Sequence, residues 1–379
     1  MKIKVVFFFL IILLTATGCS GTTDQNQARE RNLSKHADEI VIGVAWPFAE
    51  KNDGFKEGLE LALEEINDSG VLGKKVRLIV EDDQSSVTTG LSIAQSFANN
   101  MDLSAVIGHR SSVVTVPASK VYESAGLLLV APISTAPNLT GDDMSRVFRM
   151  IPSDVQIGNR MAEYAKLKNY KNMVIFYAND EYGRGLANSF EDYASANGIQ
   201  IVDRISDYKD ANDLKRLVDK WSLLNYDAIF LAESMPNGAD MITQLRKVGM
   251  DVPIIGGDAL DAVGLIDNSG QAADGIVVAS IFNPNDSRKE VTDFIEKYRS
   301  KYGTEPSKWA AQAYDSLKLL AFSIDHAGTS LPADVALAIK QLESWSGVSG
   351  VRAFNSHGDP QEMPIVLKEV RNGKFEYLK

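Results

Sequence analysis

The stretch from Ile107 to Thr140 most constrains what this chain can fold into. It holds an amphipathic segment with apolar residues at helical spacing, then the unbroken apolar run Leu127–Val130. The first pattern predicts a helix, and the second predicts a strand buried on both faces, as in a parallel sheet. Two polar turns, Ser111-Ser112 and Pro132–Thr135, stand where the strands would end. In an open α/β sheet such turns lie together at the carboxyl ends of the strands, where ligands bind.

Hydroxyl groups are concentrated in these two turns. Placed side by side, they would surround one small anion with hydroxyls and with N–H groups from the helix start. This arrangement predicts capture of a small molecule. The alternative is that Ser111 and Ser112 only cap the following helix, since serine is a preferred capping residue.

The same alternation of strand and helix patterns runs through most of the chain. It begins at Glu39, pauses at the proline of the segment RMIPS near residue 150, and then restarts. This order predicts right-handed βαβ units in two Rossmann-like lobes with parallel-core sheets. Late helical segments would return to the first lobe and the last strands to the second. We therefore expect a first lobe of residues 39–152 and 281–354, and a second of residues 153–280 and 355–379.

The N-terminus carries an export signal. Lys2 and Lys4 precede the apolar run Val5–Leu14, which is too short to span a membrane. Ala16-Thr17-Gly18-Cys19 resembles a bacterial lipobox, so residues 1–18 are interpreted as a signal peptide and Cys19 as a lipidated residue that attaches the protein to a membrane surface. Ordinary secretion with an incidental cysteine is the alternative. Residues 19–38 lack apolar periodicity and are expected to form a flexible tether.

Composition excludes several classes of function. The net charge of −11 argues against a nucleic-acid partner, which would need a basic surface. Cys19 is the only cysteine, so the sequence supports neither a disulfide nor a zinc site, and we expect no metal. There is no phosphate-binding loop and no dinucleotide fingerprint, which predicts no cofactor. An enzyme using Ser112 or Asp258 would lack a paired base. We expect a monomer without catalytic activity.

Four motifs resemble one known family. The segments IGHRSSVVTVPAS, APISTAPNLT, VEDDQS and DEYGRGLA are similar to those of type I periplasmic substrate-binding proteins of the branched-chain amino-acid class, the receptors of ABC transporters. The resemblance extends from about Glu39 to Leu378. It implies two lobes joined by three hinge crossings, here near Ile151–Ser153, Ser280–Asn283 and Phe354–Pro360.

The resemblance also implies ligand-binding roles. The first-lobe residues that would hold the carboxylate and ammonium of an amino acid are Ser112, Ile133, Ser134 and Thr135. From the second lobe, Tyr182 would close over the ligand, and Asp258 would pair with its ammonium. Elementary chemistry agrees, because a buried zwitterion needs donors for its carboxylate and an acceptor for its ammonium.

Other positions depart from the leucine-binding pattern. Trp46 stands in a shortened first loop, and Ser234 replaces a tyrosine beside Glu233. Arg110 occupies a position that is apolar in leucine-type receptors and touches the ligand side chain. Trp309 would line the side-chain pocket, although core packing is an equal alternative for both tryptophans. Arg110 could instead pair with a nearby acidic residue.

These features predict an extracytoplasmic binding lipoprotein that delivers its ligand to an ABC transporter permease. The expected ligand is an amino acid of the branched-chain type, a more polar relative, or a related amide. The alternative is a sensory module of the same fold that presents its ligand to a chemoreceptor or a sensor kinase.

Overall fold

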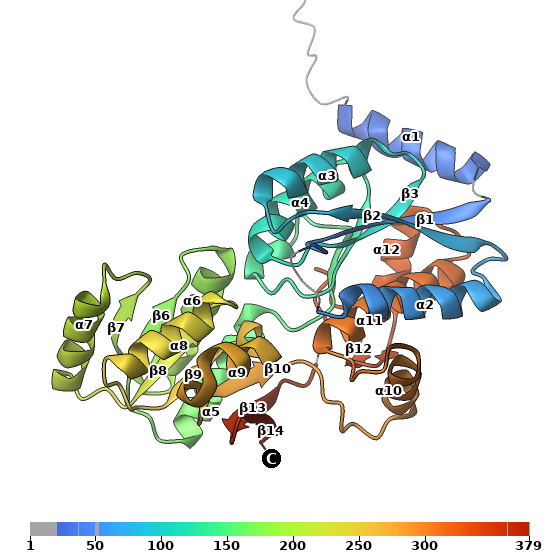
Figure 1. Cartoon of the computed structure of the whole chain (residues 1–379). Helices are drawn as coiled ribbons and strands as arrows, with labels where there is room; N and C mark the ends of the chain where they lie inside the picture. The colour runs from blue at the N-terminus through green and yellow to red at the C-terminus, as the bar shows by residue number, and fades with distance from the viewer. Residues whose placement is uncertain (1–20, 37, 50–52, 362, 379) are drawn as a thin grey trace, which may run out of the picture.

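The structure is a computed structural model that describes residues 21–36, 38–49, 53–361 and 363–378. Its first lobe is built on a parallel sheet (Figure 1). In spatial order the strands are β2 (Lys75–Asp82), β1 (Glu39–Trp46), β3 (Leu103–Gly108), β4 (Leu128–Ala131) and β5 (Val147–Arg149). The helices of this lobe are α2 (Phe55–Ser69), α3 (Val87–Asn99), α4 (Ser112–Ser124), the 3₁₀ helix η1 (Pro137–Leu139), α10 (Lys289–Tyr302), α11 (Lys308–Ala327) and α12 (Pro332–Gln341).

The second lobe has a larger sheet of mixed direction. In spatial order its strands are β14 (Lys374–Tyr377), β13 (Val366–Arg371), β10 (Val277–Ser280), β9 (Ile254–Gly256), β8 (Ala228–Ala232), β6 (Asn172–Tyr177) and β7 (Gln200–Ile205). Its helices are α5 (Asp154–Leu167), α6 (Glu181–Ala196), α7 (Ala211–Leu223), α8 (Asn237–Lys247), η2 (Asp258–Leu260), α9 (Val263–Ser269) and η3 (Gly270–Ala273). Strand β13 pairs antiparallel with both β10 and β14, whereas the other pairs are parallel. The predicted two-lobed α/β fold is confirmed.

Strand periodicity explains why helices cover both faces of each sheet. Along β1, Ile42 and Val44 face the core shared with α2, α11 and α12, whereas Val41 and Ala45 face the core under α3 and α4. Successive side chains of a strand point to opposite faces, so a strand that is apolar throughout must be covered twice. Because α10, α11 and α12 contribute to the first-lobe core, the chain returns to that lobe after completing most of the second.

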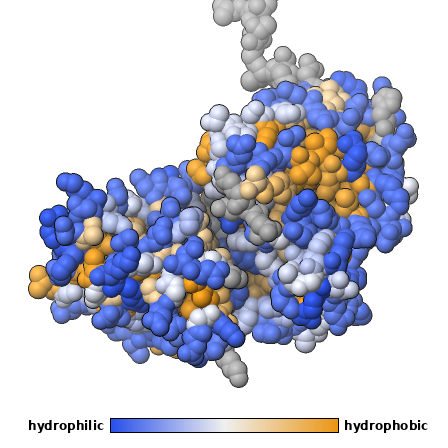
Figure 2. Space-filling view, in the orientation of Figure 1, coloured by the Kyte–Doolittle hydropathy of each residue, from blue (hydrophilic) through white to orange (hydrophobic). Residues whose placement is uncertain are grey.

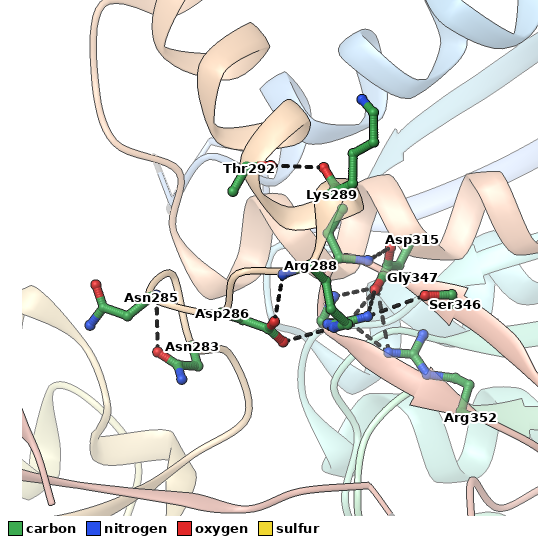
Figure 3. A network of polar contacts seen from close by, with 12 residues as sticks. Asn283, Asn285, Asp286, Arg288, Lys289, Thr292, Asp315, Ser346, Gly347 and Arg352 are labelled. Atoms are coloured by element: carbon green, nitrogen blue, oxygen red, sulfur yellow. Dashed lines mark hydrogen bonds and ion pairs between the residues drawn. The ribbon is translucent and has the colours of Figure 1, made fainter.

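The chain passes between the lobes three times, after β5, after β10 and after the strand β12 (Gly350–Arg352), which pairs with β11 (Trp345–Gly347). The second passage is fastened to the first lobe (Figure 3). Arg288 donates to the Gly347 carbonyl at 2.8 Å and is paired with Asp286 at 2.8 Å. Buried Asp315 lies beside them and is paired with Arg352 at 3.4 Å. This passage is therefore anchored where it joins the first lobe.

The prediction of a flexible tether over residues 19–38 is wrong for residues 21–36. Gly21–His36 forms the helix α1, which lies against the first lobe (Figure 1). Arg29 is 1% exposed. Its guanidinium donates to the backbone carbonyls of Ala98, Asn100, Leu103 and Ala125. Carbonyls at helix ends lack partners within the helix and favour a cation, so a polar contact rather than an apolar stripe holds α1 in place.

The face of the molecule drawn in Figure 2 is mainly hydrophilic. Figure 2 shows one hydrophobic area on the first lobe, in the region of β1 and β2. Among the described residues, no helix combines the length and apolar character needed to cross a membrane. The predicted signal peptide, residues 1–18, and the predicted lipidation site Cys19 lie outside the described residues.

Candidate functional site

The first-lobe half of the candidate site is the pair of turns at the ends of β3 and β4. Ser111 occupies the position before α4 without a side-chain capping bond, and Ser112 is the first residue of the helix. The Ser112 hydroxyl accepts a hydrogen bond from the Ser134 hydroxyl at 3.0 Å and lies 3.4 Å from the Ala136 nitrogen. The two turns therefore meet through Ser112, as expected from their place at the ends of parallel strands.

A cavity of about 70 Å³ lies between the lobes at these turns. Its lining residues are Arg110, Ser111, Ser112, Ile133, Thr135, Asp180, Tyr182, Ser234, Met235, Asp258, Ala259 and Trp309. The structure thus brings together all the residues that the sequence suggested, except Ser134 and Trp46. Ser134 is fully buried beneath the cavity and bonds to Ser112. Trp46 stacks on Phe55 with ring centroids 3.6 Å apart and belongs to the first-lobe core.

The second-lobe half is built on the start of α6 and on the turn after β9. Tyr182 lies in the first turn of α6, and its hydroxyl donates to the Asp258 carboxylate at 3.4 Å. The Tyr182 hydroxyl oxygen also accepts a hydrogen bond from the backbone nitrogen of Ala259 at 3.3 Å. A Cβ atom at Gly257 would come within 2.4 Å of the Tyr182 hydroxyl, so only glycine leaves room for this contact. The turn therefore fixes the tyrosine and the carboxylate together.

Acidic side chains are concentrated on the second-lobe side. Asp258 is 3% exposed, and burial raises its pKa while nearby Lys308 opposes that shift. Asp154, the first residue of α5, is fully buried, and neither of its carboxylate oxygens has a hydrogen-bond partner among the described residues. Burial, and then the charge of Asp258, raise its pKa well above the usual range. Asp180 lines the cavity as well. Such a surface favours a cationic group in the cavity.

Sequence reasoning missed Asp154 and Asp180 as members of this cluster. Asp180 precedes Tyr182 closely in the motif DEYGRGLA, so its proximity was a usable signal. It caps α6 by accepting from the Gly183 nitrogen at 2.8 Å. Asp154 resembles any acidic residue in a first helical turn, and nothing local indicates that it is buried beside Asp258.

Arg110 lines the cavity, and its charge is already paired. Its Nε atom lies 3.4 Å from the Asp53 carboxylate, and its guanidinium lies over the Trp309 ring, 5.0 Å from the centroid. Burial raises the pKa of Asp53, and Arg110 opposes the shift. The ion pair that was the alternative interpretation of Arg110 is therefore present, and the side chain also lines the cavity.

A buried polar chain supports the loop that carries Arg110. His109 contacts the Asp83 carboxylate through Nδ1 at 2.7 Å and the Tyr122 hydroxyl through Nε2 at 3.0 Å. All three side chains are buried. Asp83 therefore helps to hold the loop in place through His109. The described residues contain no cluster of three potential metal ligands.

A family model described as a periplasmic binding protein matches residues 40–374. The chain belongs to this family. Membership explains the two lobes, the three passages and the cavity between the lobes. Together with the relatives below, it makes the chain a type I, non-enzymatic member of the Leu/Ile/Val-binding class of ABC transporter substrate-binding proteins.

The similarity to solved and curated relatives extends over nearly the whole length of this periplasmic binding protein. An ABC transporter substrate-binding protein from Desulfitobacterium hafniense, solved in complex with Leu, is 44% identical, covers 90% of this chain and 100% of its own, and has a TM-score of 0.83. A leucine-binding protein from Thermotoga maritima is 27% identical, with 90% and 98% coverage and a TM-score of 0.83. Leu/Ile/Val-binding protein homolog 1 of Brucella abortus is 27% identical over 354 residues, which are 90% of this chain and 93% of the relative.

Glu233, next to the cavity residue Ser234, gives this binding protein a pH-dependent stability. It is 6% exposed, and one of its carboxylate oxygens has no partner among the described residues. Burial and the charge of Asp180 raise its pKa from 4.5 to about 7. The folded state therefore takes up a proton that the unfolded state has lost between these values, and stability falls as pH rises through this window.

We expect Glu233→Gln to stabilise the protein at pH 8 by about 2 kcal/mol, because the uncharged amide avoids the cost of a buried carboxylate. The gain should shrink toward zero at pH 4.5. Urea unfolding at both pH values measures it. Glu163→Gln, which removes an exposed residue paired with Arg160 at 3.5 Å, is the control. Parallel pH profiles for wild type and Glu233→Gln would contradict the assignment.

Proposed function

We propose that this protein captures a branched-chain amino acid such as leucine between its lobes and delivers it to an ABC transporter permease. One observation carries the proposal: hydroxyl groups of the first lobe and a buried carboxylate of the second line the same cavity. The relative that is 44% identical was solved in complex with Leu, which supports the choice of ligand.

The cavity offers a complementary group for each charge of a zwitterion. Ser112 and Thr135 present hydroxyls beside the start of α4, whose free N–H groups favour an anion. These groups would receive the ligand carboxylate. Asp258, oriented by Tyr182, would accept the ammonium and keep its own charge once that cation is present. This set recognises what all α-amino acids share.

The wall formed by Arg110, Ile133 and Trp309 would meet the ligand side chain. Since Asp53 compensates the charge of Arg110, this wall offers no free cation to an acidic side chain. Ile133 and the Trp309 ring add apolar surface. An aliphatic ligand therefore fits better than glutamate, whereas the sequence alone left a more polar ligand open.

Attachment to the membrane through Cys19 is part of the proposal. The support is the sequence Ala16-Thr17-Gly18-Cys19 after a short apolar run. Acyl chains contribute about 0.8 kcal/mol per buried CH₂, so more than one chain on a cysteine would hold the receptor near its permease.

Leucine at 100 times its dissociation constant should stabilise the purified protein by about 2.7 kcal/mol, and isoleucine and valine should act similarly. A thermal-shift screen of all amino acids measures this. Ser112→Ala and Thr135→Ala should each weaken every ligand by about tenfold to a hundredfold, because each removes a hydrogen bond to a charged group. A screen in which no amino acid raises the melting temperature would exclude the proposed ligand class.

Asp53→Asn should shift selectivity toward acidic amino acids. Without its partner, Arg110 becomes available to the ligand, and glutamate should gain about fivefold relative to leucine, or about 1 kcal/mol. Calorimetric titration of both ligands gives the ratio. The double variant Asp53→Asn/Arg110→Met should lose the gain. If Asp53→Asn leaves the ratio unchanged, Arg110 does not contact the ligand side chain.

Labelling with an alkyne fatty acid in cells should mark the wild-type protein and not Cys19→Ser, because Cys19 is the only cysteine in the chain. Gel fluorescence after coupling to a dye detects the label. Label on the serine variant, or none on the wild type, would exclude lipidation at this residue.

A further inference from the structure

Lys308 is a buried cation in an unfavourable place. It is the first residue of α11 in the first lobe, and its side chain is 4% exposed. The start of a helix carries partial positive charge, so a cation there is disfavoured twice, by the helix dipole and by loss of water. Burial lowers the pKa of Lys308, and the carboxylates of Asp261 and Asp258 oppose that shift. Such a placement calls for compensating contacts.

Those contacts lie on the other lobe. Lys308 Nζ donates to the backbone carbonyl of Asp258 and lies 3.9 Å from the Asp261 carboxylate. The ammonium also lies over the neighbouring Trp309 ring, 4.2 Å from the centroid. Asp258 and Asp261 belong to the second-lobe turn that starts with η2. The hydrogen bond of Lys308 therefore joins the two lobes directly.

The second-lobe end of this bridge is rigidly held. Asp261 accepts from the Ser280 hydroxyl at 2.6 Å and pairs with Lys368 at 3.0 Å, both within the second lobe. Its backbone nitrogen donates to the Asp258 carbonyl at 3.0 Å. The carbonyl that receives Lys308 is thus part of the residue whose carboxylate lines the cavity. A displacement of this turn therefore also moves the Asp258 carboxylate.

We propose that Lys308 is a positioning residue that latches the second lobe onto the first and sets how long a captured amino acid stays bound. This inference rests on the proposed function. The acidic turn of the second lobe then meets two cations on closure, the fixed Lys308 and the ammonium brought by the ligand. Neither needs to touch the side chain of the ligand. Loss of Lys308 therefore weakens all ligands by one common factor and leaves selectivity unchanged.

The test is stopped-flow or surface-plasmon kinetics of leucine, isoleucine and valine with the variant Lys308→Met, which keeps the length of the side chain and removes its charge. We expect the dissociation rate to rise by about tenfold to a hundredfold for each ligand, as for loss of one charged hydrogen bond. The association rate should change little, because the ligand first meets an open cleft.

Lys318→Met is the matched control. Lys318 lies on the same helix and pairs with Glu65 at 2.9 Å within the first lobe, so its loss removes an ion pair without crossing the cleft. Should Lys308→Met not fold, Asp261→Asn removes the carboxylate from the other side and should raise the dissociation rate in the same direction.

The possible outcomes distinguish a failure of the latch from a failure of the proposed function. If wild type binds these amino acids and Lys308→Met releases them no faster than Lys318→Met, the latch is excluded and the proposed function stands. Unequal factors for the three ligands would make Lys308 a selectivity residue and also overturn the latch. If wild type binds none of them, the proposed function fails first.

Discussion

Charge balance across the cleft is the constraint on which the rest of this molecule depends. Asp154 and Asp258 are buried on the second-lobe side, and burial raises the pKa of both because removing a carboxylate from water is costly. The first lobe contributes the hydroxyls of Ser112 and Thr135 and two buried cations, Lys308 and Arg149, whose charges oppose these pKa shifts. Under the proposed function, a zwitterion bound with its ammonium toward the second lobe adds a positive charge beside Asp258 and brings its carboxylate to the hydroxyls.

The fold delivers these groups because parallel strands end at a common edge. Ser112 begins α4 after β3, and Tyr182 lies in the first turn of α6 after β6, so equivalent turns of two separate sheets face one cavity. Each half is internally fixed before a ligand arrives, through the Ser112–Ser134 and Tyr182–Asp258 hydrogen bonds. Side chains that are already held in place lose less conformational entropy when a ligand binds.

Those features of the fold and the site that depend on local sequence patterns could be predicted from the sequence. Strand and helix periodicity gave the two lobes, and the serine-rich turns led to Ser112 and Thr135. Sequence reasoning did not identify two particular contacts between distant segments: Arg110 meets Asp53 from 57 positions away, and Lys308 meets Asp258 across 50. Helix α1 was missed for a different reason. Its docking rests on the guanidinium of Arg29, and a single polar anchor leaves no periodic trace in the sequence.

Helix α1 also determines how much slack a membrane attachment would have. The sequence leaves one residue between Cys19 and the start of α1, so covalent geometry limits the distance between the Cα atoms of Cys19 and Gly21 to about 7 Å. Because Arg29 fastens the helix to the first lobe, a lipid at Cys19 would attach that lobe directly to the bilayer. The second lobe would be connected to the membrane only through its passages to the first lobe. Ligand exchange at the membrane would then involve movement of the second lobe relative to the attached first lobe.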